Sequence, residues 1–229
     1  MCSTLQMGMP RIVILDAHTV NPGDNSWDAL EALGDLRIYP RTPSELTLER
    51  ARDADILVTN KTELDAGTLA ALPRLKGVCV LATGYDVVDV QAAKTRAIPV
   101  CNVPGYSTAS VVEHTFALIL ELCRGVGVHA AAVREGEWTR APDFTFWKTP
   151  QRELSQRVLG IVGYGSIGRA VARVGAALGM AVLATPSRSK KPEADVTVLE
   201  LDQLFAQADV ISLHCPLTPD TRELVNGER

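Results

Sequence analysis

The stretch Arg157-Val158-Leu159-Gly160-Ile161-Val162-Gly163-Tyr164-Gly165-Ser166-Ile167-Gly168-Arg169-Ala170-Val171-Ala172 decides the fold. Its apolar part, Val158–Val162, is rich in Val and Ile and predicts a strand that is buried on both faces. A Gly-x-Gly-x-x-Gly turn follows at once, and such a turn opens a helix whose free N–H groups bind a diphosphate. We therefore expect a dinucleotide site at the residues of the turn, which are Gly163, Tyr164, Gly165, Ser166, Ile167 and Gly168.

The residues after the turn support this interpretation. Apolar residues at helical spacing predict a helix over Arg169–Leu178, Gly179 ends it, and Ala181–Ala184 predicts the next strand. A structural glycine turn in some other α/β fold remains the alternative.

Composition narrows the function classes. The 229 residues are 46% hydrophobic and carry a net charge of −4, which argues against nucleic acid or an anionic membrane as a partner. The most apolar window, 111–123, is broken by Glu113, His114 and Glu121, so we expect no membrane span. The cysteines form no C-x-x-C pair, so we expect reduced, largely core thiols in a cytoplasmic protein and no metal site. They are Cys2, Cys79, Cys101, Cys123 and Cys215.

The N-terminal half alternates strands with helices, which predicts a parallel, doubly wound sheet. Strands are expected at 12–15, 36–39, 55–59, 78–81 and 98–101, and Ser44 is expected to cap a helix that ends at Arg52. Functional loops should lie at the carboxyl ends of these strands. They are Asp16–His18, Asn60-Lys61, Ala82–Tyr85 and Asn102–Gly105.

The turn at Pro104-Gly105 predicts a boundary between a domain at 1–102 and a dinucleotide-binding domain at 103–229. The helix expected at 108–124 is apolar around most of its circumference, which favours burial between domains or in a dimer interface. A second helix is expected near 126–135, and the aromatic segment 138–150 is interpreted as a packed arm, with a surface linker as the alternative. Beyond the fingerprint we expect a strand at 196–198, a helix at 201–207 and a strand at 209–213.

Over essentially its whole length the chain resembles the D-isomer-specific 2-hydroxyacid dehydrogenases. The fingerprint carries the resemblance together with Ala82–Asp89, Asn102–Thr108, Val111–His114 and Ser212–Thr218. Thr59-Asn60-Lys61 and the segment Pro142–Trp147 resemble the glycerate dehydrogenase, or hydroxypyruvate reductase, branch.

The resemblance implies a flavodoxin-like substrate domain, a Rossmann cofactor domain and a homodimer. It also implies hydride transfer between a nicotinamide cofactor and a 2-oxo acid. In the family an Arg orients the 2-oxo acid, and a His held by a Glu donates the proton to it. These three residues are expected beyond Arg229, because Gln151–Arg229 holds about half of the roughly 150 residues that a six-strand cofactor domain needs. We therefore name no catalytic residue and expect this polypeptide alone to be inactive.

By the same resemblance, the substrate carboxylate is expected at Ala82, Thr83 and Gly84, with Lys61 at the neighbouring strand end. Alternatively, Gly84 is a plain turn glycine and Lys61 a solvated lysine. Further cofactor contacts are implied at Thr108, His214, Cys215, Pro216 and Thr221. Thr108 could instead be a helix N-cap, and His214 is expected to border the nicotinamide rather than to act as the acid. The adjacent pair Glu113-His114 is interpreted as structural, because neighbouring helical residues do not face one another.

Cofactor choice depends on the end of the strand expected at Ala181–Ala184, the second strand of the dinucleotide-binding domain. NAD sites place an acidic residue there, about 20 residues after the glycines. Pro186 stands there instead, followed by Arg188, Lys190 and Lys191 and accompanied by the hydroxyls of Thr185 and Ser187. This set suits the 2′-phosphate of NADP(H), so we expect NADP(H) to be preferred and NAD(H) to remain possible. A solvated basic loop is the alternative.

The sequence therefore predicts an NADP(H)-preferring reductase of hydroxypyruvate or glyoxylate. A regulatory or scaffold protein that binds a dinucleotide without catalysis is the competing hypothesis.

Overall fold

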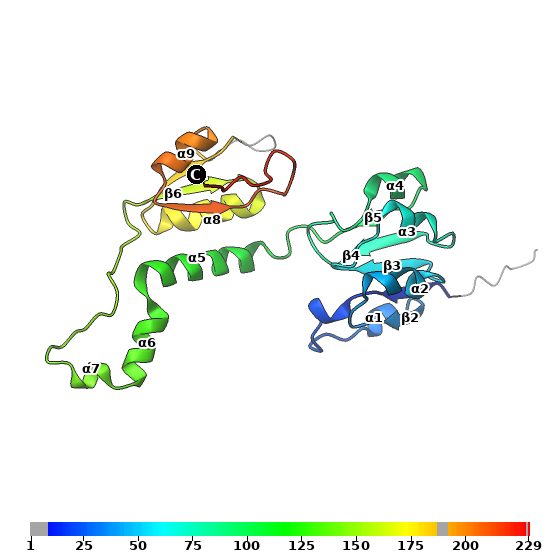
Figure 1. The fold of residues 1–229 in the computed structure, drawn as a ribbon, viewed down its shortest axis with the longest axis horizontal. Coiled ribbons are helices and arrows are strands. Elements are labelled where there is room, and N and C mark those ends of the chain that lie inside the picture. Colours follow the sequence, from blue (N-terminus) through cyan, green and yellow to red (C-terminus); the bar gives the residue numbers. More distant parts are fainter. Residues whose placement is uncertain (1–8, 187–191, 228) are drawn as a thin grey trace, which may run out of the picture. The chain divides into compact units, whose positions relative to one another are not determined.

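The computed structural model describes residues 9–186, 192–227 and 229. The chain divides into two compact units, Met1–Tyr106 and Ser107–Arg229. Each unit has its own parallel sheet with helices packed against it (Figure 1). The predicted α/β fold with two doubly wound parallel sheets is thereby confirmed.

The first sheet has the strand order β2-β1-β3-β4-β5, and every neighbouring pair is parallel. This is the order of a flavodoxin-like fold, and its direction reverses between β1 and β3, so a crevice is expected where these two strands end. The strands are β1 (Arg11–Ile14), β2 (Asp35–Ile38), β3 (Ile56–Thr59), β4 (Gly77–Val80) and β5 (Val100–Cys101).

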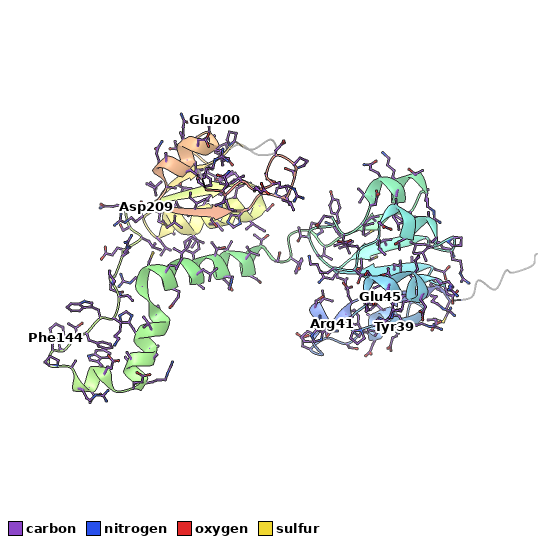
Figure 2. All side chains as sticks on the ribbon, in the orientation of Figure 1. Tyr39, Arg41, Glu45, Phe144, Glu200 and Asp209 are labelled. Atoms are coloured by element: carbon purple, nitrogen blue, oxygen red, sulfur yellow. The ribbon has the colours of Figure 1, made fainter. Side chains whose placement is uncertain are left out.

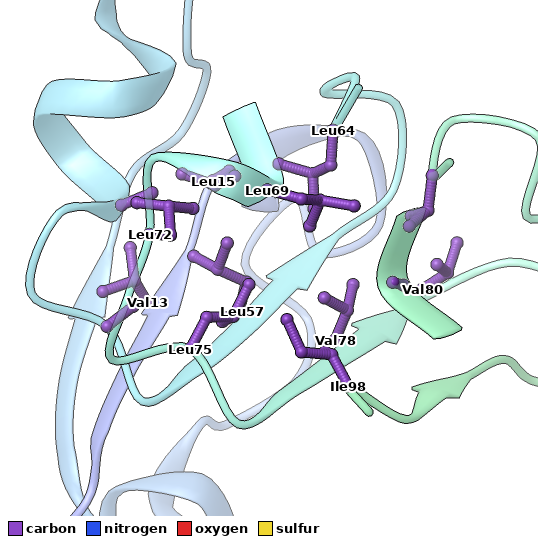
Figure 3. Close-up of a cluster of buried hydrophobic side chains, with 14 of the residues drawn as sticks. Val13, Leu15, Leu57, Leu64, Leu69, Leu72, Leu75, Val78, Val80 and Ile98 are labelled. Atoms are coloured by element: carbon purple, nitrogen blue, oxygen red, sulfur yellow. The ribbon is translucent and has the colours of Figure 1, made fainter. Parts of the chain in front are cut away.

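Side chains from alternate strand positions bury both faces of this sheet. On one face, Val13, Leu57 and Val78 pack in a single cluster with buried residues of the helices that cover this face (Figure 3). Ile12 and Ile14 pack on the other face. The first unit's helices are α1 (Asp28–Glu31), α2 (Thr47–Ala51), α3 (Ala66–Ala70) and α4 (Val90–Thr95), with 3-10 turns η1 (Ala17–Thr19) and η2 (Ser44–Leu46).

The predicted cap at Ser44 is wrong. Pro43 is the residue before the turn η2, Ser44 already belongs to that turn, and α2 starts only at Thr47. The side chains of Asp65 and Asp89 do cap helices: Asp65 accepts from the Thr68 amide at 2.7 Å, and Asp89 caps α4.

The second sheet has the order β8-β7-β6-β9, again parallel throughout. One face is covered by α8, against which α5 packs through Val112, Phe116 and Ile119. The other face is covered by α9. The elements are β6 (Val158–Val162), β7 (Ala181–Ala184), β8 (Val196–Val198), β9 (Val210–Leu213), α5 (Thr108–Arg124), α8 (Ser166–Ala177) and α9 (Leu201–Gln207).

Two sequence expectations need correction, namely the start of α8 and the burial of the cysteines in both units. Helix α8 begins at Ser166 rather than Arg169, because the last glycine of the fingerprint lies inside the first helical turn. Helix α5 leaves part of its apolar surface exposed within the unit, with Leu118 53% and Leu122 85% exposed, so its burial between domains or in a dimer interface stays a prediction. None of the four described cysteines is fully buried, and Cys101 is exposed.

Two short helices and the arm follow α5. They are α6 (Val126–Arg134) and α7 (Glu137–Arg140). The arm folds back on them, since the Trp138 indole N–H donates to the Phe144 carbonyl at 3.0 Å and the Lys148 amide donates to His129 Nε2 at 3.0 Å. The Phe144 side chain points away from these helices and is 91% exposed (Figure 2).

No single described helix has the length and apolarity to cross a membrane, although α5 and α6, bent by 64°, meet those criteria as a pair. No three His, Cys, Asp or Glu side chains are grouped to hold a metal in the described part of the chain.

Candidate dinucleotide-binding site

Each fingerprint glycine occupies a position with a distinct steric requirement. Gly163 has a φ of +97°, and a methyl group added there would lie 2.5 Å from the amide nitrogen of Cys215. A methyl group at Gly168 would meet the carbonyl oxygen of Gly163, so the helix can approach its strand this closely only through glycine. Gly165, in contrast, faces open space, with no heavy atom within 4 Å of the added methyl group.

The first turn of α8 offers backbone donors beside that open space. No side chain caps the helix, because the N-cap residue is Gly165. The first amides of a helix have no partner inside it, and they carry the positive end of the helix dipole. Open space next to Gly165 and uncapped amides at Ser166 and Ile167 fit the diphosphate of a dinucleotide.

The end of β9 lies directly beside the glycine turn. The His214 amide donates to the Val162 carbonyl at 2.7 Å, which brings the backbone of His214 and Cys215 against Gly163. This is also where the strand order reverses, between β6 and β9, so the turn lies at the switch point of its sheet.

The His214 side chain is partly buried and has a defined partner. Its Nε2 lies 2.8 Å from Ser212 Oγ, and burial lowers the pKa of the imidazole. A neutral imidazole with one nitrogen committed to Ser212 suits a wall of the site.

The segment after His214 is held by the hydroxyl of Thr221. This hydroxyl donates to the Pro216 carbonyl at 2.6 Å and accepts from the Thr218 amide at 2.7 Å. Thr221 therefore shapes the turn that follows β9, at the edge of the sheet where the glycine turn lies.

On the β7 side, Thr185 contacts the glycine turn directly, because its hydroxyl accepts from the Gly163 amide at 3.1 Å. Ser187, Arg188 and Lys190, expected to bind a 2′-phosphate, lie outside the described residues.

The next described carboxylate, Glu193, is paired with two arginines of α8. Its Oε1 lies 3.1 Å from Arg169 Nη2 and 2.7 Å from Arg173 Nη2, and hydrogen bonds from Arg173 and Arg169 lower the pKa of the carboxyl group. Within the described residues, the hydroxyl of Tyr164 is buried without a hydrogen-bond partner.

Thr108 is the first residue of α5, preceded by Ser107 at the N-cap position. The N-cap alternative for Thr108 is therefore wrong.

The loops predicted to bind substrate lie in the first unit, at the ends of the adjacent strands β3 and β4. Thr83 is fixed from β5, because the Asn102 side chain donates to its carbonyl at 2.8 Å and its own hydroxyl donates to the Val103 carbonyl at 3.1 Å. Both Thr83 and Gly84 are exposed, and their amides donate to no acceptor in the described part of the chain. Two neighbouring free amides suit a carboxylate.

Lys61 lies in the neighbouring loop and is exposed. No described carboxylate lies within ion-pairing distance of its ammonium group. The backbone of this loop is held by Asp16, a residue that the sequence placed only among the strand-end loops.

Comparison with known proteins identifies the family. Residues 116–229 match the family described as "D-isomer specific 2-hydroxyacid dehydrogenase, NAD binding domain". A hydroxypyruvate reductase of Blautia hydrogenotrophica is 47% identical over 224 residues, which cover 95% of this chain and 69% of the relative. The chain belongs to the D-isomer-specific 2-hydroxyacid dehydrogenase family.

Further relatives of this dehydrogenase agree with the resemblance seen in the sequence. A glycerate dehydrogenase of Methylorubrum extorquens is 39% identical over 188 residues, covering 82% of this chain and 58% of the relative. A solved acyclic imino acid reductase in complex with NADPH and D-Arg superimposes with a TM-score of 0.78 at 28% identity, covering 92% of this chain and 67% of that one. The chain thus spans about three fifths to two thirds of the length of these relatives, and its cofactor is a nicotinamide dinucleotide.

Proposed function

We propose that this protein reduces a small 2-oxo acid, hydroxypyruvate or glyoxylate, to the D-2-hydroxy acid with hydride from NADPH. The observation that carries the proposal is the pair of free, exposed amides at Thr83 and Gly84, at a strand end next to Lys61. The similarity to hydroxypyruvate reductase and glycerate dehydrogenase supports the same substrate class.

Each group of residues has a defined task in this proposal. The amides of Thr83 and Gly84 hold the substrate carboxylate, and the Lys61 ammonium adds a positive charge beside it. The turn at Gly163–Gly168 holds the diphosphate, while His214 borders the nicotinamide ring. The nicotinamide, when bound, supplies the hydride. We assign no proton donor among the described residues.

A substrate comparison tests the proposal. We expect the protein in its natural full length to oxidise NADPH with hydroxypyruvate and glyoxylate but not with hydroxyacetone, which keeps the carbonyl and hydroxyl groups and lacks the carboxylate. Equal turnover of hydroxyacetone would contradict the carboxylate site. Cofactor binding without turnover of any 2-oxo acid would instead support a protein that binds the dinucleotide without catalysis.

We also propose that NADPH is preferred over NADH. Pro186 stands where an NAD site has its acid, and the nearby carboxylate of Glu193 is already bound by Arg169 and Arg173. The basic residues that would bind the 2′-phosphate include Arg188 and Lys190. We expect Arg188→Ala to raise the Kd for NADPH about tenfold or more and to leave the Kd for NADH unchanged. Equal effects on both cofactors would overturn the preference argument.

We propose, finally, that two copies associate through α5, α6 and the arm. Leu122, Phe144 and Trp147 are 85%, 91% and 71% exposed, and a group of large exposed apolar side chains marks an interaction surface. Light scattering should show a dimer for the wild type and a monomer for L122S/W147S. Leu48→Ser, at an exposed leucine of α2, is the matched control and should leave the dimer intact.

We also propose a cytoplasmic location, which the free thiols Cys79, Cys101, Cys123 and Cys215 favour.

A further inference from the structure

A buried carboxylate occupies the switch point of the first sheet. Asp16 lies two residues after the end of β1 and is only 7% exposed. Its Oδ1 accepts from the Asn60 amide at 2.8 Å, and its Oδ2 accepts from the Thr62 amide at 2.9 Å and from the Lys61 amide. Three consecutive backbone donors of the loop after β3 therefore point at one side chain from the end of β1.

Further bonds tie the same two loops together. The Asn60 side-chain amide donates to Thr19 Oγ1 at 2.8 Å, which joins the loop after β3 to the turn η1. The hydroxyl of Thr59 donates to the Thr62 carbonyl at 3.0 Å and closes the turn within the loop itself. Asn60 and Thr62 are buried, whereas Lys61 between them is exposed.

Burial of the Asp16 side chain costs free energy, because it removes a carboxylate from water. A carboxylate taken out of water needs several hydrogen bonds to compensate for its lost hydration, and here the backbone of one loop supplies all three. In open parallel sheets the crevice at the switch point is where ligands bind. In this unit the Asp16 carboxylate lies at that point and accepts from the amides of residues 60–62, whereas the Lys61 side chain between Asn60 and Thr62 is exposed.

We propose that Asp16 is a positioning residue of the substrate site: by holding the amides of Asn60, Lys61 and Thr62, it fixes the backbone from which Lys61 projects. This inference rests on the proposed function, because Lys61 is the residue that meets the substrate. The same loop also borders a polar cavity of about 480 Å³, which does not include Thr83 or Gly84 and is lined by Thr42, Ser44, Thr47, Lys61, Thr62, Glu63, Asp65 and Thr68. The position of the Lys61 ammonium group depends on the loop that Asp16 holds.

The expected result of Asp16→Asn follows from hydrogen-bond chemistry. An amide NH2 group in place of one carboxylate oxygen would face N–H donors, so part of the loop loses its acceptor. We expect D16N to raise the KM for hydroxypyruvate about tenfold while kcat changes less, since a misplaced cation weakens substrate binding. The Kd for NADPH should stay unchanged, because the dinucleotide fingerprint lies in the other unit.

A double-mutant cycle with Lys61→Met separates positioning from general damage. If Asp16 acts through Lys61, D16N should raise KM little further in the K61M background. Asp55→Asn is the matched control. Asp55 is 6% exposed and also accepts a backbone hydrogen bond, but it lies before β3, at the amino ends of the strands and away from the substrate loops. It should lower stability without changing KM.

The outcomes distinguish the inference from the function it rests on. An active wild-type protein with a wild-type KM in D16N, or with additive effects of D16N and K61M, overturns the role of Asp16 alone. A wild-type protein that turns over neither hydroxypyruvate nor glyoxylate overturns the proposed function and this inference together. If D16N does not fold, Asn60→Ala carries the test, because it removes only the bond to Thr19 and should raise KM by a smaller factor.

Discussion

The amide of Gly163 donates a hydrogen bond to the hydroxyl oxygen of Thr185 across 3.1 Å. This bond joins the glycine turn after β6 to the residue that follows β7, so the first glycine of the turn is held from the neighbouring strand end. The turn and the end of β7 border the same part of the proposed cofactor site.

Replacing Thr185 therefore should loosen the turn. We expect Thr185→Val to lower the free energy of unfolding by about 1 kcal/mol, because the Gly163 amide loses its acceptor while the side-chain volume is kept. The Kd for NADPH should rise as well. Thr185→Ser retains the hydroxyl and should restore both values in chemical denaturation and fluorescence titration. A valine variant as stable and as tight-binding as wild type would show that the bond has no influence on the turn.

The two first glycines of the fingerprint should respond differently to alanine. Gly163→Ala combines a left-handed backbone with a clash against Cys215, so we expect a loss of more than about 2 kcal/mol of stability. Gly165→Ala meets no protein atom and should melt near the wild-type temperature. Its methyl group would instead occupy the space assigned to the diphosphate, so the Kd for NADPH should rise at least tenfold. A Gly165→Ala variant that binds NADPH normally would contradict the placement of the diphosphate.

Asp55 should make stability depend on pH in the acid range. The backbone hydrogen bond from Arg11 and the side chain of Lys76 hold the pKa of the Asp55 carboxyl below its usual value. A depressed pKa in the folded state means that the contribution is fully present above about pH 4, the unfolded pKa, and is lost as the pH falls through the folded pKa. The stability difference between wild type and Asp55→Asn should therefore be constant at neutral pH and shrink in acid. A difference that grows on acidification would give the opposite sign.

His129 should determine whether the arm stays attached to α6. The ring bridges two parts of the chain, with Nδ1 2.6 Å from the Gly125 carbonyl oxygen and Nε2 accepting from the Lys148 amide. We expect His129→Ala to speed tryptic cleavage at Arg140 and Lys148 several-fold, because both hydrogen bonds and the contact with Phe146 are lost. His18→Ala changes an exposed histidine elsewhere and should leave the cleavage rate unchanged.

Much of the fold could be predicted because its signals are local. The strand at Val158–Val162 and the helix at Thr108–Arg124 begin and end where the sequence places them. Apolar periodicity and glycine punctuation are read from adjacent residues, and the structure keeps them because both sheets are buried on two faces. The start of α8 differs for a local reason as well, since a glycine that would break most helices is required there by close packing.

The arrangement of the candidate site could be predicted only in part. The sequence places Asp16–His18 and Asn60-Lys61 at the same edge of a sheet, but it does not say that β1 and β3 are neighbours. That adjacency comes from the strand order, which depends on how all five strands pair. The bonds from Asp16 to the loop after β3 link residues 44 to 46 positions apart, and no pattern within a short window contains them.

The division after Tyr106 has a consequence for synthesis of the chain. Among the described residues, every strand from β1 to β5 pairs with another strand of the same segment, and none pairs with β6–β9. All backbone partners of the first sheet have therefore been translated before the fingerprint leaves the ribosome. The first unit can acquire its sheet during translation, so a substitution that ruins the glycine turn should leave a folded amino-terminal half on the nascent chain.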